Sequence, residues 1–110
     1  MITQDEIQKC FDFLRDSAPA IANARYAKVK SEELRKVIWS EIRNGITTGP
    51  QSERDAYAYA HKDYRDHIET MAEAAREFQM LYSQREAAIA KIEAWRTSSA
   101  NERGAHRVAA

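Results

Sequence analysis

The amino-acid sequence predicts an all-α protein whose body is a long, coiled-coil-like antiparallel helical hairpin. The first supporting observation is the scarcity of helix breakers, since the 110 residues contain only three glycines and two prolines. The second is that one loop near the middle separates two long stretches in which apolar residues recur at helical spacing. Two helical arms of similar length joined by one loop favour an antiparallel hairpin.

The first arm is predicted to begin at Thr3, which has capping-box spacing to Glu6. Pro19 either starts a new helix or interrupts a continuous one, and we favour a kink or break near Pro19. Asn44 and Gly45 form a good helix stop. The apolar pattern of this arm comprises Ile7, Phe11, Leu14, Ile21, Tyr26, Val29, Leu34, Val37, Ile38 and Ile42.

Residues 44–50 hold two of the three glycines and are predicted to form the loop. A short helix at 52–59 follows, and the second arm then runs from about Asp63 to Asn101 without glycine or proline. Its apolar seam, from Ile68 to Ser99, steps alternately by three and four residues. We therefore predict one hairpin domain over 1–103 and a flexible tail over 104–110.

Charge and cysteine content narrow the function classes. The 17 basic and 17 acidic residues give a net charge of zero, so any nucleic-acid contact must come from local clusters. Cys10 is the only cysteine, which excludes an internal disulfide and fits a cytoplasmic location. The chain starts without a signal-peptide pattern and has no apolar run of about 18 residues, so no membrane contact is expected.

The sequence gives little support for nucleophilic or acid–base catalysis. It contains no GxSxG, P-loop or GxGxxG motif. Cys10 precedes Phe11 on the apolar face, where a buried core role is favoured over that of a nucleophile. Two carboxylate pairs at helical spacing, Asp12 with Asp16 and Glu73 with Glu77, have no obvious pocket to separate their pKa values.

One group of residues has the spacing of a metal site. His61, Asp63 and His67 lie close in sequence, and the last two would share a helical face. The favoured alternative is that His61 and Asp63 cap the second arm while His67 faces solvent. We therefore predict a protein that is not an enzyme and that uses no metal or cofactor.

The basic residues gather in two places. Those in the second half of the first arm are diluted by acids, and Glu32 has the spacing to pair with Lys36, so a salt-bridged surface is favoured. The second cluster lies at the C-terminal end, and an aromatic ring beside guanidinium groups suits single-stranded nucleic acid. Ion pairing with acids at the start of the first arm is the favoured alternative. The cluster contains Trp95, Arg96, Asn101, Arg103, His106 and Arg107, and the acids are Asp5, Glu6, Asp12 and Asp16.

Large aromatic rings are numerous for so thin a body, and some should remain exposed on a single hairpin. A homodimer with a four-helix arrangement would cover them, and a foreign protein partner is the alternative. The rings are Trp39, Tyr57, Tyr59, Tyr64, Phe78, Tyr82 and Trp95.

Two segments of the second half resemble a family of small uncharacterised helical phage and prophage proteins. Residues 91–103 read KIEAWRTSSANER and resemble the family's C-terminal "IEAWRTxxANxR" signature. Residues 53–58 and 64–68 resemble its middle "REAYA…Y..HL" region. The first half matches only as a long charged helix, and Pro19 departs from the uninterrupted first helix of the family.

The resemblance implies a short, helical, phage-encoded protein that accompanies recombination or single-strand annealing. It brings no catalytic residue, and the matching signature positions are Trp95, Arg96, Asn101 and Arg103. The leading hypothesis is a non-catalytic accessory protein of DNA recombination or replication that binds single-stranded DNA or a recombinase. The alternatives are a phage-encoded inhibitor that binds a host defence or nuclease machine, and a structural coiled-coil component of a virion.

Overall fold

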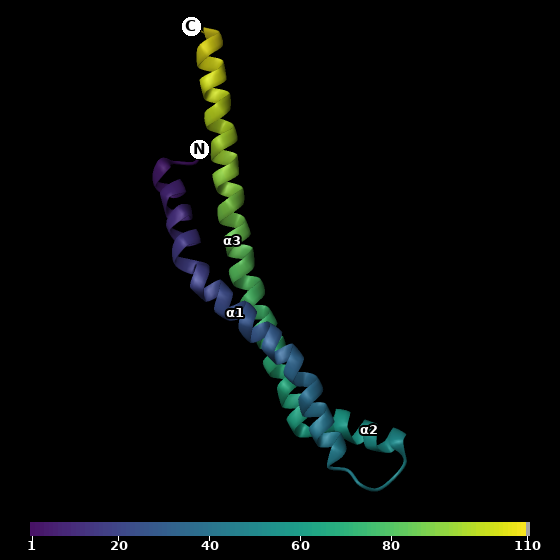
Figure 1. The fold of residues 1–110 in the computed structure, drawn as a ribbon. Coiled ribbons are helices and arrows are strands. Elements are labelled where there is room, and N and C mark those ends of the chain that lie inside the picture. The colour runs from purple at the N-terminus through teal and green to yellow at the C-terminus, as the bar shows by residue number, and fades with distance from the viewer. Residues whose placement is uncertain (110) are drawn as a thin grey trace. The chain divides into compact units, whose positions relative to one another are not determined.

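The computed structural model describes the backbone of residues 1–109 and the side chains of residues 1–105. It contains α1 (Gln4–Asn44), α2 (Gln51–Ala60) and α3 (Lys62–Ala109), as Figure 1 shows. No strand occurs among the described residues. The predicted all-α hairpin, with two long helices and a short helix between them, is confirmed.

The predicted boundaries of α1 have clear chemical causes. The Thr3 N–H donates to Glu6 Oε2 (2.9 Å), and the Glu6 N–H donates to Thr3 Oγ1 (3.2 Å), which confirms the capping box. At the other end, the Gly45 N–H donates to the carbonyls of Glu41 and Ile42 as the helix closes. Gly49 has a φ of 95°, which glycine adopts without strain, so the loop can turn towards α2.

Pro19 lies inside α1, which is continuous on both sides of it. Of the predicted kink or break, the break and the restart of a new helix are wrong, because α1 runs through Pro19 without interruption. Proline has no N–H, so the carbonyl of Arg15 lacks its usual helical donor four residues ahead. The cost of Pro19 is the loss of this hydrogen bond rather than the loss of the helix.

The contacts divide the chain into two compact units. Unit 1 comprises Met1–Ile21 and Met80–Ala110, and unit 2 comprises Ala22–Gln79. Within unit 1, the first turns of α1 lie beside the second half of α3 (Figure 1). Within unit 2, α1 and α3 are antiparallel, because Arg25 lies over the ring of Phe78 while Ser31, further along α1, contacts His67.

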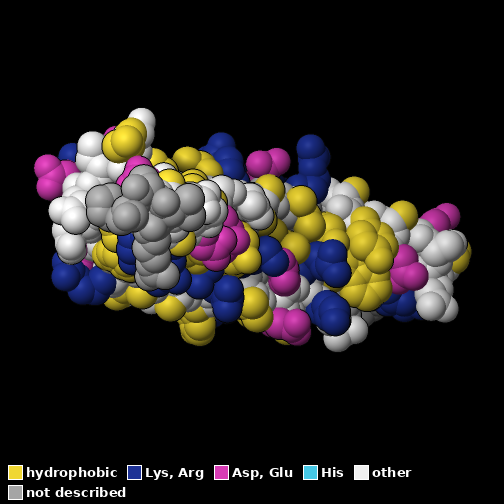
Figure 2. All heavy atoms as spheres, turned by 90° about the horizontal axis from the view of Figure 1, so that it is seen from above, with side chains coloured by type: hydrophobic (Ala, Val, Ile, Leu, Met, Phe, Trp, Pro, Cys, Tyr) yellow, Lys and Arg dark blue, Asp and Glu magenta, His cyan; other side chains and the backbone are white. Residues whose placement is uncertain are grey.

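The buried face of α1 differs from the apolar pattern of the sequence. Ile7 of the predicted pattern is buried, but the other buried positions step by seven residues through Ser17, Ala24 and Ser31. These three side chains are all small, and small side chains let two helices approach closely. In contrast, Phe11 is exposed, as are Tyr26, Val29, Leu34 and Val37. Figure 2 shows such hydrophobic side chains at the surface, between the charged ones. These five residues of the apolar pattern are therefore not core.

In α3, Ala88 and Ile92 are the buried apolar residues, and both lie in unit 1. Ile68, at the start of the predicted seam, is 38% exposed. The helix continues past Gly104 to Ala109, and the predicted flexible tail over 104–110 stays a prediction, because the side chains of 106–110 lie outside the described residues. Among the described helices, none combines the length and apolar character needed to cross a membrane.

Candidate functional site

The C-terminal part of α3 carries the four residues that the sequence singles out, and they do not share one environment. Trp95 is half-buried, whereas Arg96, Asn101 and Arg103 are exposed. Among the described side chains, these three make no hydrogen bond or ion pair. In unit 1, α3 continues beyond the level at which α1 begins, so α1 cannot cover this end (Figure 1). His106 and Arg107 lie outside the described side chains.

The acids at the start of α1 do not pair with this C-terminal cluster among the described residues. Glu6 caps α1, while Asp12 accepts from Gln8 (3.0 Å) and Asp16 accepts from Arg15 (2.8 Å). The side-chain hydrogen bond from Arg15 lowers the pKa of Asp16, and the same bond raises the pKa of Arg15. The alternative in which these acids neutralise Arg96 and Arg103 is therefore not realised in the described structure.

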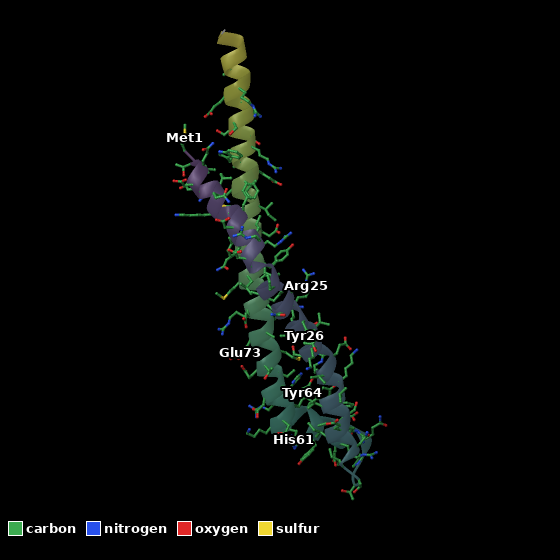
Figure 3. The ribbon with its side chains drawn as sticks, turned by 60° about the vertical axis from the view of Figure 1, so that its left-hand side comes forward. Met1, Arg25, Tyr26, His61, Tyr64 and Glu73 are labelled. Atoms are coloured by element: carbon green, nitrogen blue, oxygen red, sulfur yellow. The ribbon has the colours of Figure 1, made fainter. Side chains whose placement is uncertain are left out.

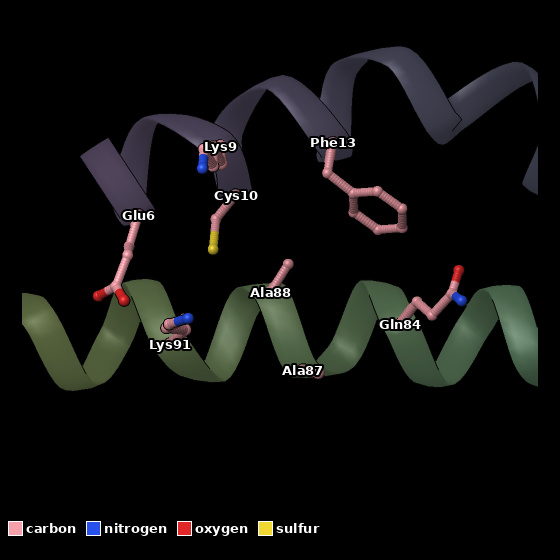
Figure 4. A pocket seen from close by; sticks show the side chains of 8 residues that line it. All are labelled: Glu6, Lys9, Cys10, Phe13, Gln84, Ala87, Ala88 and Lys91. Atoms are coloured by element: carbon pink, nitrogen blue, oxygen red, sulfur yellow. The ribbon is translucent and has the colours of Figure 1, made fainter. Parts of the chain in front are cut away.

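A mostly apolar groove of about 580 Å³ lies in unit 1 between α1 and α3. Figure 4 shows Cys10 and Phe13 pointing from α1 towards α3, with Ala88 pointing back towards Cys10. The charged groups at its margin are Glu6, Lys9 and Lys91. No histidine lines the groove, and Cys10 lies between the helices but is half-buried, not fully buried as predicted.

The two histidines of the candidate metal group, His61 and His67, make hydrogen bonds with the backbone. The Asp63 N–H donates to His61 Nδ1 (3.1 Å), so His61 caps α3 as predicted. His67 is half-buried, and its Nε2–H donates to the Ser31 carbonyl across 2.6 Å. The prediction that His67 faces solvent is wrong, because this contact turns the ring towards α1. The described residues contain no group of three or more ligands suited to a metal ion.

The hairpin end of unit 2 is held by an ion pair and by contacts between aromatic rings. Arg43 Nε donates to Asp55 Oδ1 (2.6 Å), which joins the end of α1 to α2. The ring centroid of Tyr59 lies 5.3 Å from that of Trp39 and 5.6 Å from that of Tyr64, in tilted and edge-on arrangements that aromatic pairs favour. Figure 3 shows Tyr64 and His61 at this end of the hairpin.

These rings form one side of a pocket of about 410 Å³ in unit 2 that the sequence analysis did not find. Arg35, Lys36 and Ser40 of α1 complete the lining with Trp39, Tyr59 and Tyr64. The only sequence signal is the i, i+4 spacing of Arg35 to Trp39 and Lys36 to Ser40, which places both cations beside one helical edge. The contribution of the two tyrosines depends on where α2 and α3 begin, and spacing does not reveal that.

An apolar stripe lies on the outer face of α1 in unit 2. Tyr26, Val29 and Val37 are 66%, 50% and 49% exposed and lie on the face opposite to Ala24 and Ser31. Lys30 Nζ lies 5.6 Å from the centroid of the Tyr26 ring. Figure 3 labels Tyr26 and its neighbour Arg25 on α1. This stripe is an exposed apolar surface of the kind that meets a partner, and the sequence analysis did not predict it, because it assigned these residues to the apolar pattern of the first arm.

Comparisons of the chain with protein-family models, with curated proteins and with solved structures find no match. Its function therefore has to be argued from the surfaces described above.

Proposed function

We propose that the chain is a non-catalytic, phage-type accessory protein of DNA recombination or replication. It acts in the cytoplasm of the host cell by binding single-stranded DNA or a recombinase through the end of α3. The supporting observation is that Arg96, Asn101 and Arg103 are exposed and unpaired among the described side chains. Guanidinium groups are the usual bidentate ligands of phosphate and of carboxylate, so they suit either partner.

Trp95 gives this end an aromatic surface in addition to charge. The residue lies one position before Arg96, and its ring is half-buried, so part of it stays accessible for stacking. Stacking on aromatic side chains holds unpaired bases without requiring a particular sequence. The same ring beside an arginine is also a common anchor in protein interfaces.

Binding to a labelled single-stranded oligonucleotide at two salt concentrations tests the direct form of this proposal. Salt-sensitive binding is expected, and the double variant Arg96→Ala/Arg103→Ala should lower the salt slope by about 1.4, since each phosphate contact on a single strand contributes about 0.7. The matched control is Arg65→Ala/Arg76→Ala, which removes the same charge from exposed positions of α3 in unit 2. Equal losses in both double variants would contradict a site at the end of α3.

If no binding occurs at low salt, the direct form is discarded and the recombinase form is tested by capture. The purified chain and Arg96→Ala/Arg103→Ala would be used as baits against a purified single-strand-annealing protein. Retention by the unchanged chain and loss with the variant are expected. Retention by both baits, or by neither, would reject the end of α3 as the contact.

A second candidate function is supported by the outer apolar stripe of α1, formed by Tyr26, Val29 and Val37. The chain exposes 8303 Å², whereas a folded monomer of 12.6 kDa typically exposes about 6200 Å². The excess is larger than the roughly 800 Å² that each partner buries in a standard specific interface. It favours a homodimer, or an inhibitor that binds a host defence protein along this stripe.

The molar mass measured by light scattering distinguishes the two partners proposed for the stripe, a second copy of the chain and a host defence protein. A dimeric mass at micromolar concentration that becomes monomeric in Val29→Ser/Val37→Ser is expected for the homodimer. A monomeric mass in the unchanged chain would reject the homodimer and leave the stripe to a different protein. Glu33→Gln/Glu73→Gln is the control, because both residues are exposed and neither belongs to the stripe.

A further inference from the structure

The pocket at the hairpin end of unit 2 combines cations and rings without an acid. Its lining contains one guanidinium, one ammonium and one hydroxyl group from α1, and three aromatic rings. No carboxylate lines it, although the chain as a whole has equal numbers of acidic and basic residues. The pocket is therefore positive in its immediate surroundings, and its volume of about 410 Å³ falls in the usual range for small-molecule sites.

The two cations are unpaired, and for Lys36 the structure shows the reason. The sequence predicts that Glu32 pairs with Lys36, but Glu32 Oε1 accepts from Lys28 Nζ instead (2.7 Å). Neither Arg35 nor Lys36 makes an ion pair with a described residue. An anion that reaches the pocket therefore meets two charged donors that no other described group competes for.

Trp39 adds a donor that the protein itself does not satisfy. Its indole Nε1 is buried and has no hydrogen-bond partner among the described residues. A buried N–H without an acceptor costs stability, so such groups commonly have a structural or functional explanation.

We propose that this pocket binds one nucleotide of a single-stranded nucleic acid. Arg35 and Lys36 hold the phosphate, and the base lies against the rings of Tyr59 and Tyr64. A nucleotide carries both an anion and a planar ring, and the pocket offers donors on α1 and aromatic surface on α2 and α3. This site lies in unit 2, so it extends the proposed function to a second surface and does not depend on the end of α3.

Trp39 provides a built-in reporter. The chain has two tryptophans, so Trp95→Phe leaves Trp39 as the sole source of indole fluorescence. Titration of that variant with oligothymidylate and with thymidine monophosphate should change the emission. Thymidine alone and inorganic phosphate alone should require at least tenfold higher concentrations, because each engages only one half of the pocket. Comparison of the dissociation constants for thymidine monophosphate and for oligothymidylate shows whether neighbouring nucleotides add affinity.

The charge variant is Arg35→Gln/Lys36→Gln in the Trp95→Phe background. Both side chains are exposed, so the variant should keep its helical circular dichroism, while the dissociation constant for the strand rises at least tenfold. The matched control is Arg76→Gln/Lys91→Gln, which removes one guanidinium and one ammonium from exposed positions of α3 that belong to neither proposed site and should leave the Trp39 response unchanged. Tyr59→Leu should weaken the nucleotide far more than inorganic phosphate, because it removes a ring and keeps both cations.

Several outcomes would overturn the assignment. One is a Trp39 signal that does not respond to the strand, and another is an equal loss in the two charge variants. Polyglutamate that changes the signal at a lower concentration than oligothymidylate would reassign the pocket to an acidic peptide. If strand binding persists without a Trp39 response and depends on Arg96 and Arg103, this inference fails while the proposed function stands.

Discussion

The two units of the chain use the same pair of helices but hold them together differently. Unit 1 buries Ile7 on α1 and Ile92 on α3, so apolar side chains supply its core. Unit 2 buries only small apolar side chains, Ala24 and Ala58, and joins its helices through the His67–Ser31 hydrogen bond and the Arg43–Asp55 ion pair. One hairpin can therefore combine a stretch held by burial with a stretch held by directional contacts.

This difference also separates the candidate surfaces. Close packing of small residues in unit 2 leaves the large rings at the hairpin end to pack on one another and to line a pocket. In unit 1, the apolar core ends where α1 begins, and α3 carries exposed arginines beyond it. The two proposed sites therefore use different parts of α3. The pocket uses Tyr64 near the start of α3 in unit 2, and the other site uses Arg96 and Arg103 near its end in unit 1.

The largest effect is expected in the core of unit 1. Ile92 is 5% exposed, and Ile92→Ala should lower the free energy of unfolding by about 2–4 kcal/mol, because it removes buried methyl groups and leaves a cavity. The matched control, Ile68→Ala, changes a residue that is 38% exposed and should cost about 1 kcal/mol or less. Urea unfolding followed by circular dichroism measures both, and equal costs would remove the distinction between the units.

The next effect concerns the ion pair at the hairpin end of unit 2. The side chains of Arg43 and Asp55 are 18% and 35% exposed, so water screens the pair only in part. A double-mutant cycle of Arg43→Gln and Asp55→Asn should give a coupling energy of about 1–2 kcal/mol, between the values for surface and buried pairs. A coupling near zero would show that α2 is held to α1 by other contacts.

A smaller effect is expected from the hydrogen bond between α3 and α1. His67→Ala should cost about 1 kcal/mol, the usual net value of an intramolecular hydrogen bond. The acceptor is the backbone carbonyl of Ser31, so Ser31→Ala should leave the cost of His67→Ala unchanged. Strong non-additivity between the two substitutions in urea unfolding would mean that the Ser31 hydroxyl takes part.

The smallest effect is expected at Arg15 and Asp16 in unit 1. Arg15 lowers the pKa of Asp16, so the pair stabilises the fold above the carboxyl's ordinary pKa, and this contribution is lost as the pH falls through the lowered value. Both side chains are well exposed, so solvent screens the contribution. Asp16→Asn should therefore leave the melting temperature unchanged at neutral and mildly acidic pH, and a marked drop at neutral pH would show a larger structural role.

The helices and the loop could be predicted from the sequence because local chemistry determines them. The Thr3–Glu6 capping box, the stop at Gly45 and the absence of breakers through most of α3 act over a few residues. Pro19 shows the limit of such rules, since helical neighbours on both sides outweigh one missing donor.

The buried face of α1 could not be predicted in the same way. Apolar residues occur on two sides of this helix, and periodicity alone does not say which side meets α3. The core side carries Ser17, Ala24 and Ser31, whose small side chains add little to a hydrophobic pattern but allow close approach. The large residues Tyr26 and Val37, which dominate the pattern, therefore lie on the opposite side.

The candidate sites also differ in how far they could be predicted from the sequence. The exposure of Arg96 and Arg103 agrees with a binding role read from a short local segment, whereas the pocket at Trp39 requires three helices to converge. Sequence spacing places Arg35 and Lys36 on one edge but does not show that Glu32 turns back to Lys28. Both Lys28 and Lys36 are four residues from Glu32, so spacing alone does not decide which of them stays unpaired.

The antiparallel pairing of α1 and α3 is tested most directly by a disulfide between them in unit 1. Cys10 is the only cysteine and lines the same groove as Ala88, so Ala88→Cys should form an intramolecular disulfide under mild oxidation in dilute solution. Ala105→Cys, on the exposed end of α3, should remain reduced under the same conditions. No disulfide in Ala88→Cys, or equal formation in both variants, would contradict the pairing of the two helices in unit 1.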